Sequence, residues 1–253
     1  MKAPTVLMMN DSMYETMYAL ERTHWWFRGK RKIVLSAIPS RVQNTELIDF
    51  GCGTGIMLKE LCKLGEVTGL DKNANALDFC RNRVDVRLVQ ADLSERLPLD
   101  TKYDVGVALD VLEHIEDDLS ALINMRDTLQ YGSTLIITVP AFKFMWSTHD
   151  EQCAHKRRYS YKELEKLIIS SGLIIDYLSY YNSFLFPVIA LLRCFNKVFN
   201  NSTKNELENK QYGKAVNSIL YYIFICEKFF IQHRIKLPFG VSLIAVLRRG
   251  ELA

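Results

Sequence analysis

Short apolar runs alternate with amphipathic stretches along residues 46–139 of the chain. The apolar runs have the length and composition of buried strands, whereas the stretches between them repeat apolar residues at helical spacing. Strands that alternate with helices predict parallel β-α units joined by right-handed crossovers. We therefore expect strands at approximately residues 46–50, 66–71, 85–90, 103–109 and 133–139.

The segments that flank this region supply further elements. An aromatic face and a basic cluster run along residues 12–38, which predicts a single long helix. On the other side, residues 161–171 predict a helix with Gly172 as its cap. Two more strands are expected at residues 173–181 and 240–248.

About sixty residues separate the last two predicted strands, far more than an ordinary connection contains. Residues 184–192 and 219–226 are apolar helical candidates on either side of the polar segment 200–209. Both are well short of the ~20 residues that a membrane span needs. We therefore expect an inserted helical cap or lid over residues 184–239.

The charges of this insertion are biased toward lysine and arginine. Its acids are Glu206, Glu208 and Glu227, against the bases Arg193, Lys197, Lys204, Lys210, Lys214, Lys228, Arg234 and Lys236. A cap that packs on the core or forms a homodimer is the expected role. Contact with an anionic membrane surface, or with an acidic or lipid-like substrate, is the alternative.

A glycine-rich loop follows the first predicted strand. Asp49 precedes three glycines at alternate positions, and an amphipathic helix pattern begins at Ile56. Glycine tolerates positive φ and lets a ligand approach the backbone, so strand, loop and helix predict a nucleotide-type site. The spacing is one residue shorter than a dinucleotide fingerprint, and no Lys-Ser or Lys-Thr follows it as in a phosphate-binding loop.

The acid and the glycines resemble the first motif of the class I S-adenosylmethionine-dependent methyltransferases. Asp49, Gly51, Gly53 and Gly55 fill its four positions. The resemblance spans approximately residues 40–180. It implies an α/β fold with a Rossmann-like, doubly wound, seven-stranded mixed sheet, whose last strand pairs antiparallel at the sheet edge. It also implies S-adenosyl-L-methionine as the cofactor.

Further acids follow the next predicted strands. Asp71 lies about twenty residues after the glycine loop, where such folds bind ribose hydroxyls. In the resembled family, an acid in the position of Asp92 and the next residue, Leu93, meet the adenine. The remaining residues assigned to the cofactor site are Cys52, a small filler rather than a nucleophile, with Lys72, Asp110 and Val111.

The N-terminal segment His24-Trp25-Trp26-Phe27 is followed by several basic residues. It is similar to a bacterial branch of these enzymes described with glycan, lipid or secondary-metabolite pathways. That similarity implies that Trp26 or Arg28 closes over the cofactor, with an arginine, Arg28 or Arg31, pairing with the methionine carboxylate. The alternative is a packed amphipathic helix whose tryptophans belong to the core.

Two clusters are candidates for acceptor chemistry. Methyl transfer needs the acceptor atom to be oriented and, where that atom is protonated, a base. His149, in the loop after the fifth strand, is the leading candidate base, and His155 is the second. His114 would share a helical face with Asp110 if the segment after the fourth strand is helical.

The sequence also resembles the metal-binding pattern of some small-RNA and quinone-pathway O-methyltransferases. In this pattern an acid precedes a Glu-His pair, here Glu113-His114, and a second histidine follows at a distance. The first acid here is Asp110 rather than the usual glutamate. We expect no metal site, with Glu113 and His114 structural or lining the acceptor pocket.

Composition adds few constraints. The net charge of +3 is small for 253 residues, which makes nucleic acid an unlikely partner. Six cysteines lack a C-x-x-C pair, and residues 1–10 lack the pattern of a signal peptide, so we expect a cytoplasmic protein with reduced thiols. The expected domains are an N-terminal cover (1–40), a methyltransferase core (41–183), the insertion (184–239) and the last core strand (240–253).

These patterns predict a methyltransferase that acts on an oxygen or nitrogen atom of a small-molecule acceptor, such as a secondary metabolite, a glycan or a lipid-linked compound. Two alternatives stay open. One is a metal-assisted O-methyltransferase acting on RNA or a quinone-type acceptor. The other is a non-catalytic protein that binds the cofactor and regulates a partner.

Overall fold

The computed structural model describes residues 11–39, 45–198 and 212–250. The strands are β1 (Thr45–Phe50), β2 (Gly65–Asp71), β3 (Arg87–Gln90), β4 (Tyr103–Leu109), β5 (Leu129–Pro140), β6 (Leu173–Tyr181) and β7 (Ser242–Arg249). The α-helices are α1 (Asp11–Leu20), α2 (Trp25–Ala37), α3 (Ile56–Leu61), α4 (Ala74–Arg81), α5 (Asp118–Thr128), α6 (Thr148–Gln152), α7 (Tyr161–Ser170), α8 (Phe186–Val198), α9 (Lys214–Ile225) and α10 (Glu227–Gln232). Two 3-10 turns complete the set, η1 (Leu112–His114) and η2 (Lys143–Met145).

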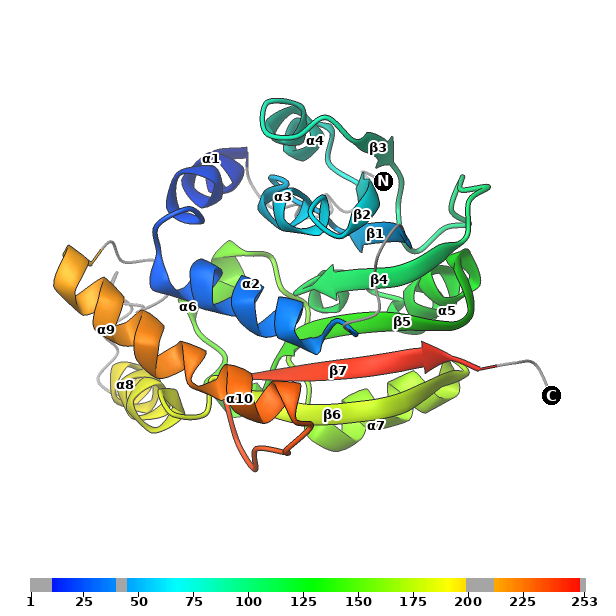
Figure 1. Cartoon of the computed structure of the whole chain (residues 1–253). Coiled ribbons are helices and arrows are strands. Elements are labelled where there is room, and N and C mark those ends of the chain that lie inside the picture. The colour runs from blue at the N-terminus through cyan, green and yellow to red at the C-terminus, as the bar shows by residue number, and fades with distance from the viewer. Residues whose placement is uncertain (1–10, 40–44, 199–211, 251–253) are drawn as a thin grey trace, which may run out of the picture.

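The strands form one sheet in the order β3-β2-β1-β4-β5-β7-β6, which confirms the predicted seven-stranded mixed sheet (Figure 1). β7 pairs antiparallel with both β5 and β6, so the expectation that the last strand lies at the edge is wrong. The burial of the two strands agrees with this order. β7 is buried along its first six residues, as an interior strand requires, whereas β6 exposes side chains such as Ile174 and forms the edge.

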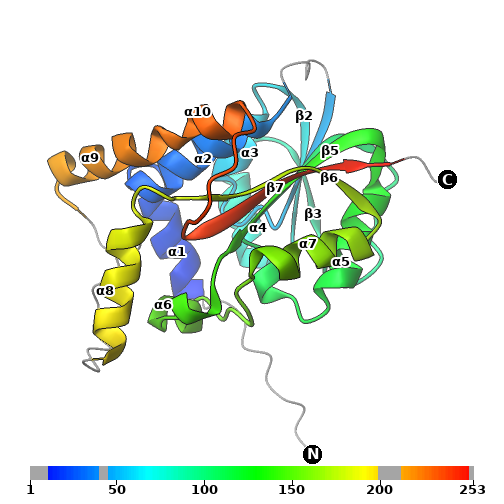
Figure 2. The same cartoon turned by 90° about the horizontal axis from the view of Figure 1, so that it is seen from below.

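Helices cover both faces of the sheet (Figure 2). On one face, side chains of α2, α3, α4, α9 and α10 pack with the sheet into one apolar cluster. On the other face, α5 and α7 contribute to a second cluster. This two-sided coverage leaves the carboxyl ends of the parallel strands as the place where a site can form.

The N-terminal segment forms two helices rather than the single helix predicted. A turn at residues 21–24 separates α1 from α2. The side chain of His24 caps α2 by accepting a hydrogen bond from the Trp26 amide at 3.3 Å. α2 ends at Ala37, because Ile38 takes the extended backbone that a following proline favours.

The insertion before β7 supplies α8, α9 and α10, and α9 and α10 lie along α2 (Figure 1). Asn217 joins α9 to the start of α2, accepting from the Trp25 amide and donating to the Thr23 carbonyl, both at 2.8 Å. The polar segment 200–209 lies outside the described residues. Within the described part of the chain, every helix is too short or too polar to cross a bilayer.

Candidate functional site

A cavity of about 520 Å³ opens at the carboxyl ends of β1, β2 and β4. This volume is within the range of small-molecule sites. α1, α2 and α6 gather at the same end of the sheet (Figure 1). The glycine loop and the strand-end acids line one half, which we term the donor half. Residues of η1, α6 and the segment after α6 line the other half, which we term the acceptor half.

The glycine loop forms the floor of the donor half. Gly51, Gly53 and Gly55 all have positive φ, at 70°, 53° and 80°. A Cβ atom on Gly51 would lie 2.6 Å from the side chain of Val111, which itself lines the cavity. Cys52 is buried, with its Sγ 3.8 Å from that of Cys80, and does not line the cavity. The loop therefore requires glycine for both its backbone shape and its close packing.

Asp71 joins the end of β2 to the glycine loop. Its carboxylate accepts hydrogen bonds from the Gly53 amide at 2.8 Å and from the Asn73 amide at 2.9 Å. Burial raises the pKa of Asp71, and these amides oppose the rise. Asp49 lies behind the loop. The pKa of Asp49 is raised to about 8, chiefly by burial and also by the negative charge of Asp71, while Lys30 opposes the rise.

Asp92 and Lys72 form the outer rim of the donor half. They pair at 2.5 Å, and both line the cavity. Leu93 is buried beside them, and the side-chain amide of Asn124 fixes its carbonyl at 2.8 Å. The pair is partly exposed, so a ligand can exchange with Lys72 as the partner of Asp92.

Asp110 lies between the two halves and has an unusual backbone, with φ at 56°. It is not part of a helix, because the turn after β4 is the short η1, so the predicted helical face does not form. The Asp110 carboxylate accepts from Lys30 at 2.5 Å and from the Thr138 hydroxyl at 2.8 Å. Burial alone would raise its pKa, but Lys30 and Thr138 lower it.

The N-terminal cover contributes Trp26 and Lys30, one helical turn apart on α2, to the cavity wall. Trp26 stacks on Phe224 with ring centroids 5.2 Å apart. Arg28 and Arg31 do not line the cavity. The Arg28 guanidinium lies 4.3 Å from the ring centroid of Tyr221.

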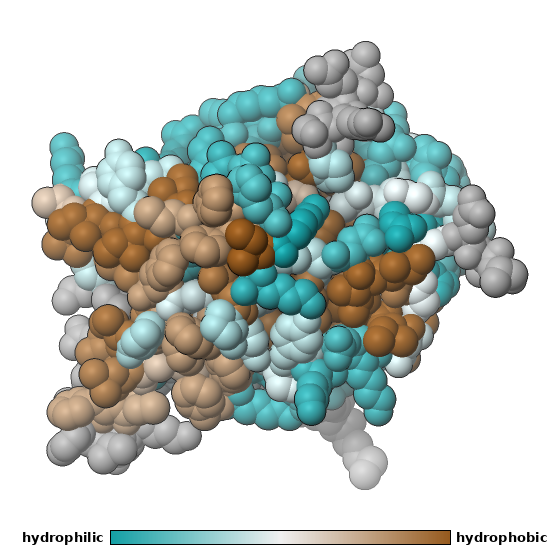
Figure 3. Space-filling model, turned by 60° about the horizontal axis from the view of Figure 1, so that its bottom comes forward, coloured by the Kyte–Doolittle hydropathy of each residue, from teal (hydrophilic) through white to brown (hydrophobic). Residues whose placement is uncertain are grey.

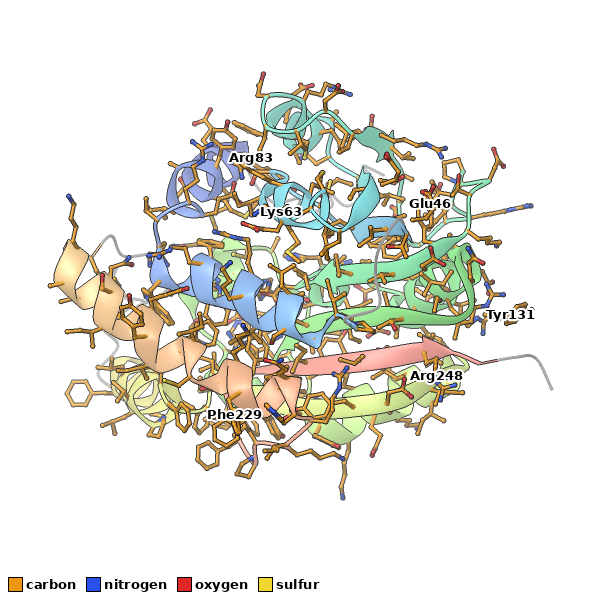
Figure 4. The ribbon with its side chains drawn as sticks, viewed as in Figure 1. Glu46, Lys63, Arg83, Tyr131, Phe229 and Arg248 are labelled. Carbon is orange, nitrogen blue, oxygen red and sulfur yellow. The ribbon has the colours of Figure 1, made fainter. Side chains whose placement is uncertain are left out.

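A buried carboxylate fastens the cover to the glycine loop. The Thr54 hydroxyl donates to the Glu21 carboxylate and lies 2.7 and 2.8 Å from its two oxygens. Glu21 also pairs with Arg83, which lies beside α1 (Figure 4). Arg31 donates to the Glu21 carbonyl at 2.7 Å. Trp25 is fully buried and belongs to the core. The segment thus combines a packed helix with a wall of the cavity.

The acceptor half contains a buried glutamate and three histidines. Glu113 is fully buried and lines the cavity, and neither of its oxygens has a hydrogen-bond partner among the described residues. Burial raises its pKa well above the usual value, and Asp110 adds to the rise. The ring of His114 makes a T-shaped contact with that of His155, with ring centroids 4.7 Å apart. The pKa of His114 is lowered to about 4, chiefly by burial and in addition by the nearby His155.

His155 is held in place by a buried ion pair. Its Nδ1 lies 2.8 Å from the carboxylate of Asp150, which also accepts from Arg158 at 2.7 Å. Burial would raise the pKa of Asp150, but these two partners hold it well below its usual range. His149 also lines the cavity, with its ring nitrogens 3.7 and 3.8 Å from the Sγ of Cys153. Its ring centroid is 6.0 Å from that of His155.

Three residues of this half have the composition of a metal site. One ligand atom each from Glu113, His114 and His155 can be chosen so that all lie within 4.8 Å of one another. Asp150 orients His155 from behind, as an outer partner of a metal-bound histidine does. A divalent ion with oxygen and nitrogen ligands fits these donors.

Two functional candidates were missed at the sequence level. Lys30 was grouped with a basic cluster, although its spacing of four from Trp26 places both on one helical face. Asp150 follows the candidate base directly in sequence, and only the turn after α6 brings it to His155.

Comparison with known proteins agrees with this geometry. Residues 48–137 match the model of a methyltransferase domain. A "probable S-adenosylmethionine-dependent methyltransferase" of Mycobacterium tuberculosis is 27% identical over 177 residues. That match covers 68% of this chain and 63% of the relative, so this chain spans less than two thirds of the curated protein it resembles. A ubiquinone biosynthesis O-methyltransferase of Rickettsia conorii is 28% identical over 131 residues, which cover 48% of this chain and 45% of that protein.

The fold itself recurs in solved methyltransferases. Phosphoethanolamine N-methyltransferase 2 of Haemonchus contortus, in complex with S-adenosylhomocysteine, superposes with a TM-score of 0.63 at 14% identity. The superposition covers 96% of this chain and 58% of that chain. With the matched domain, the sheet order and the glycine loop, it leads to one conclusion. Residues 48–137 form a methyltransferase domain, and the chain has the fold of the class I S-adenosylmethionine-dependent methyltransferases.

Proposed function

We propose that this protein transfers a methyl group from S-adenosylmethionine to an oxygen or nitrogen atom of a small-molecule acceptor in the cytoplasm. The main support for the proposal is that one continuous cavity contains both groups of residues. The glycine loop and Asp71 line one side of it, and His114, His149 and His155 line the other side. A methyl donor and an acceptor can therefore share one space. The cytoplasmic location is supported by the six cysteines, none of which forms a disulfide.

In this proposal, the donor half holds the cofactor. The Asp71 carboxylate is placed to accept hydrogen bonds from ribose hydroxyls, since two backbone amides already fix its orientation. Leu93 and Asp92 offer an apolar contact and an acceptor for a base ring. Lys30 and Trp26 line the cavity from the side of α2, and Lys30, which pairs with Asp110, would offer a cation to the cofactor's carboxylate. The bound cofactor would supply an electrophilic methyl group on a positively charged sulfur.

The acceptor half supplies the base. Because a carboxylate can only accept, the contact with Asp150 places the proton of neutral His155 on Nδ1 and leaves Nε2 with a lone pair. His155 Nε2 would take the proton of the acceptor as the acceptor atom bonds to the methyl carbon and the carbon–sulfur bond breaks. His149 was ranked first on sequence, but the Asp150–His155 pair gives His155 the stronger support. His149 would then line the acceptor pocket.

A transfer assay tests the proposal. The protein is incubated with methyl-labelled S-adenosylmethionine and fractionated small-molecule extracts, and label is followed into products. We expect label in an extractable product that depends on His155. Tight binding of the cofactor without transfer to any fraction would instead support a non-catalytic role.

A second candidate function is metal-assisted O-methylation. The two oxygens of Glu113 favour it, because neither has a hydrogen-bond partner among the described residues and Oε1 lies 4.0 Å from His155 Nε2. In that case His155 would be a ligand rather than a base, and a divalent ion would orient the acceptor oxygen. Activity that is lost with a chelator and restored by Mg²⁺ or Mn²⁺ would support this candidate, and unchanged activity after dialysis against chelator would exclude it.

A further inference from the structure

Large apolar side chains are exposed mainly on the insertion. Of the sixteen such residues in the described part of the chain, twelve lie between residues 184 and 239. They are Phe184, Val188, Leu191, Leu192, Phe195, Val216, Ile219, Tyr222, Ile223, Phe229, Ile235 and Phe239. Figure 3 shows apolar side chains on the side of the molecule that carries α8 and α9. We term these residues the apolar face. Such a concentration marks an interaction surface rather than scattered exposure.

The two longer helices of the insertion, α8 and α9, expose apolar side chains to solvent. One side of α9 is packed on the cover, where Phe224 contacts Trp26 and is fully buried. Its other side exposes Ile219 to 59% and Tyr222 to 66%, and on α8 Leu191 is 71% exposed. Helices of 13 and 12 residues are about 20 Å long, which suits helices that lie in the plane of a bilayer surface.

Among the described residues of the insertion, the exposed charges have one sign. Lys214, Lys228, Arg234 and Lys236 are exposed. Among the described residues of the insertion, Glu227 is the sole acid, and it is fully buried, where its carboxylate accepts from the Ser183 amide at 2.6 Å. A partner that approaches this face therefore meets exposed cations and no exposed carboxylate within the described insertion.

We propose that the apolar face docks on an anionic bilayer surface, with the apolar side chains in the headgroup region and the surrounding lysines and arginines against lipid phosphates. The one-signed charge decides between the candidate occupants. A symmetric dimer through this face would bring like charges together, which costs energy, whereas an anionic membrane neutralises them.

The docking face adjoins the cavity. α9 packs on α2, whose Trp26 lines the cavity, and Arg193 of α8 donates to the Met145 carbonyl at 2.8 Å, in the turn that precedes α6. In Figure 1, α8 and α9 lie at the end of the sheet where β4 ends. Docking would bring the mouth of the site near the membrane, which suits an acceptor dissolved in it. The docking itself does not depend on methyl transfer.

Vesicle co-sedimentation tests the proposal with the full chain. The vesicles are phosphatidylcholine alone or phosphatidylcholine mixed with phosphatidylglycerol. We expect binding to the mixed vesicles at low ionic strength and a steep loss of binding as salt is added, because the cations are screened. Equal binding to neutral and anionic vesicles, or binding to neither, would overturn the proposal.

Two sets of variants locate the surface. The triple variant Leu191→Ser, Ile219→Ser and Tyr222→Ser should bind mixed vesicles at least about tenfold more weakly. Its matched control is the pair Tyr131→Ser and Ile169→Ser, which removes apolar side chains that are 53% and 63% exposed elsewhere on the molecule. Tyr131 lies at the opposite end of the sheet (Figure 4), and the control should bind like the wild type.

The charge variant is Lys214→Gln with Lys228→Gln, and each change should weaken binding by about fivefold. The control pair is Lys59→Gln with Lys162→Gln, both exposed on other helices. Thermal melts verify that every variant folds. Sedimentation velocity is run in parallel. A wild-type dimer that the triple variant abolishes, without vesicle binding, would identify a second copy as the occupant and contradict membrane docking.

Discussion

The two halves of the cavity differ in how their polar groups are satisfied. In the donor half, Asp71 is held by backbone amides of its own loop and of the glycine loop. In the acceptor half, Glu113 is buried without a hydrogen-bond partner among the described residues, and His155 depends on a buried ion pair. The donor half is thus organised before any ligand binds. The acceptor half retains polar atoms that a ligand or an ion would satisfy.

The largest effect is expected from removing the candidate base. His155→Ala should lower turnover by about 10²–10⁴-fold, while the affinity for S-adenosylhomocysteine stays within about twofold of the wild type, because only the acceptor half changes. His149→Ala, at the other candidate base, serves as the comparison and should lower turnover less. Single-turnover kinetics and calorimetry measure the two quantities. The reverse ranking of the two histidines would show that His149 is the base.

The next effect concerns the glycine loop. Gly51→Ala should weaken the affinity for S-adenosylhomocysteine by about 100-fold, because the new Cβ would lie 2.6 Å from Val111 at a backbone φ of +70°. Gly132→Ala is the matched control, since Gly132 has a similar φ of +79° with nothing within 4 Å of its added Cβ. The control should cost about 1 kcal/mol of stability and leave affinity unchanged. Equal loss of affinity in both variants would contradict a specific role for the loop.

A third prediction concerns the ion pair of the acceptor half. Asp150→Asn should destabilise the fold by about 3 kcal/mol near pH 7, because the buried Arg158 loses its counter-charge. The pKa of Asp150 is lowered in the fold, so its stabilisation is present at neutral pH and is lost as the pH falls below the ordinary pKa of an aspartate. Asp176→Asn is the control, since it breaks only the half-exposed pair with Arg248 at the sheet edge (Figure 4).

Denaturant unfolding of both variants across pH measures these effects. The control should change stability by less than about 1 kcal/mol. A loss in Asp150→Asn that is equally small would show that the pair is not a support of the acceptor half.

The smallest effect has the opposite dependence on pH and belongs to the donor half. The pKa of Asp49 is raised to about 8 in the fold, so the folded state retains a proton that the unfolded state releases. This contribution favours the fold below the ordinary aspartate pKa and is lost as the pH rises through about 8. Between pH 6 and pH 7, the wild type should lose about 1.4 kcal/mol relative to Asp49→Asn. Parallel stability curves for the two proteins would contradict a protonated Asp49.

Local patterns were enough to predict that the glycine loop and Asp71 lie together. The strand, the glycines and Asp71 are close in sequence, and hydrophobic period and glycine spacing carry their structure. The acceptor half was less predictable, because Glu113 and His155 are about forty residues apart and only the turns after β4 and β5 bring them together. The sequence pointed to Glu113 and His155 as candidates. It did not reveal the contact with Asp150 that favours His155 as the base.

Two elements of the fold differ from the prediction, each for its own reason. β7 lies inside the sheet rather than at its edge, and neither a strand's period nor its composition determines its neighbours. The single N-terminal helix predicted is two, because His24 caps α2. The cap is an unusual residue type for that position, so the usual signals for a helix start were missing.

In the proposed function, the glycine loop and Asp71 hold the cofactor. Titration calorimetry with S-adenosylhomocysteine on the wild type and on Asp71→Ala tests it directly. The control is Asp78→Ala, which removes an exposed acid of α4 that pairs only with Arg81. We predict a loss of about 10- to 100-fold in affinity for Asp71→Ala and none for the control, as expected when a charged hydrogen-bond acceptor is removed. An affinity equal to that of the wild type, in a variant whose thermal melt shows it folded, would contradict the account.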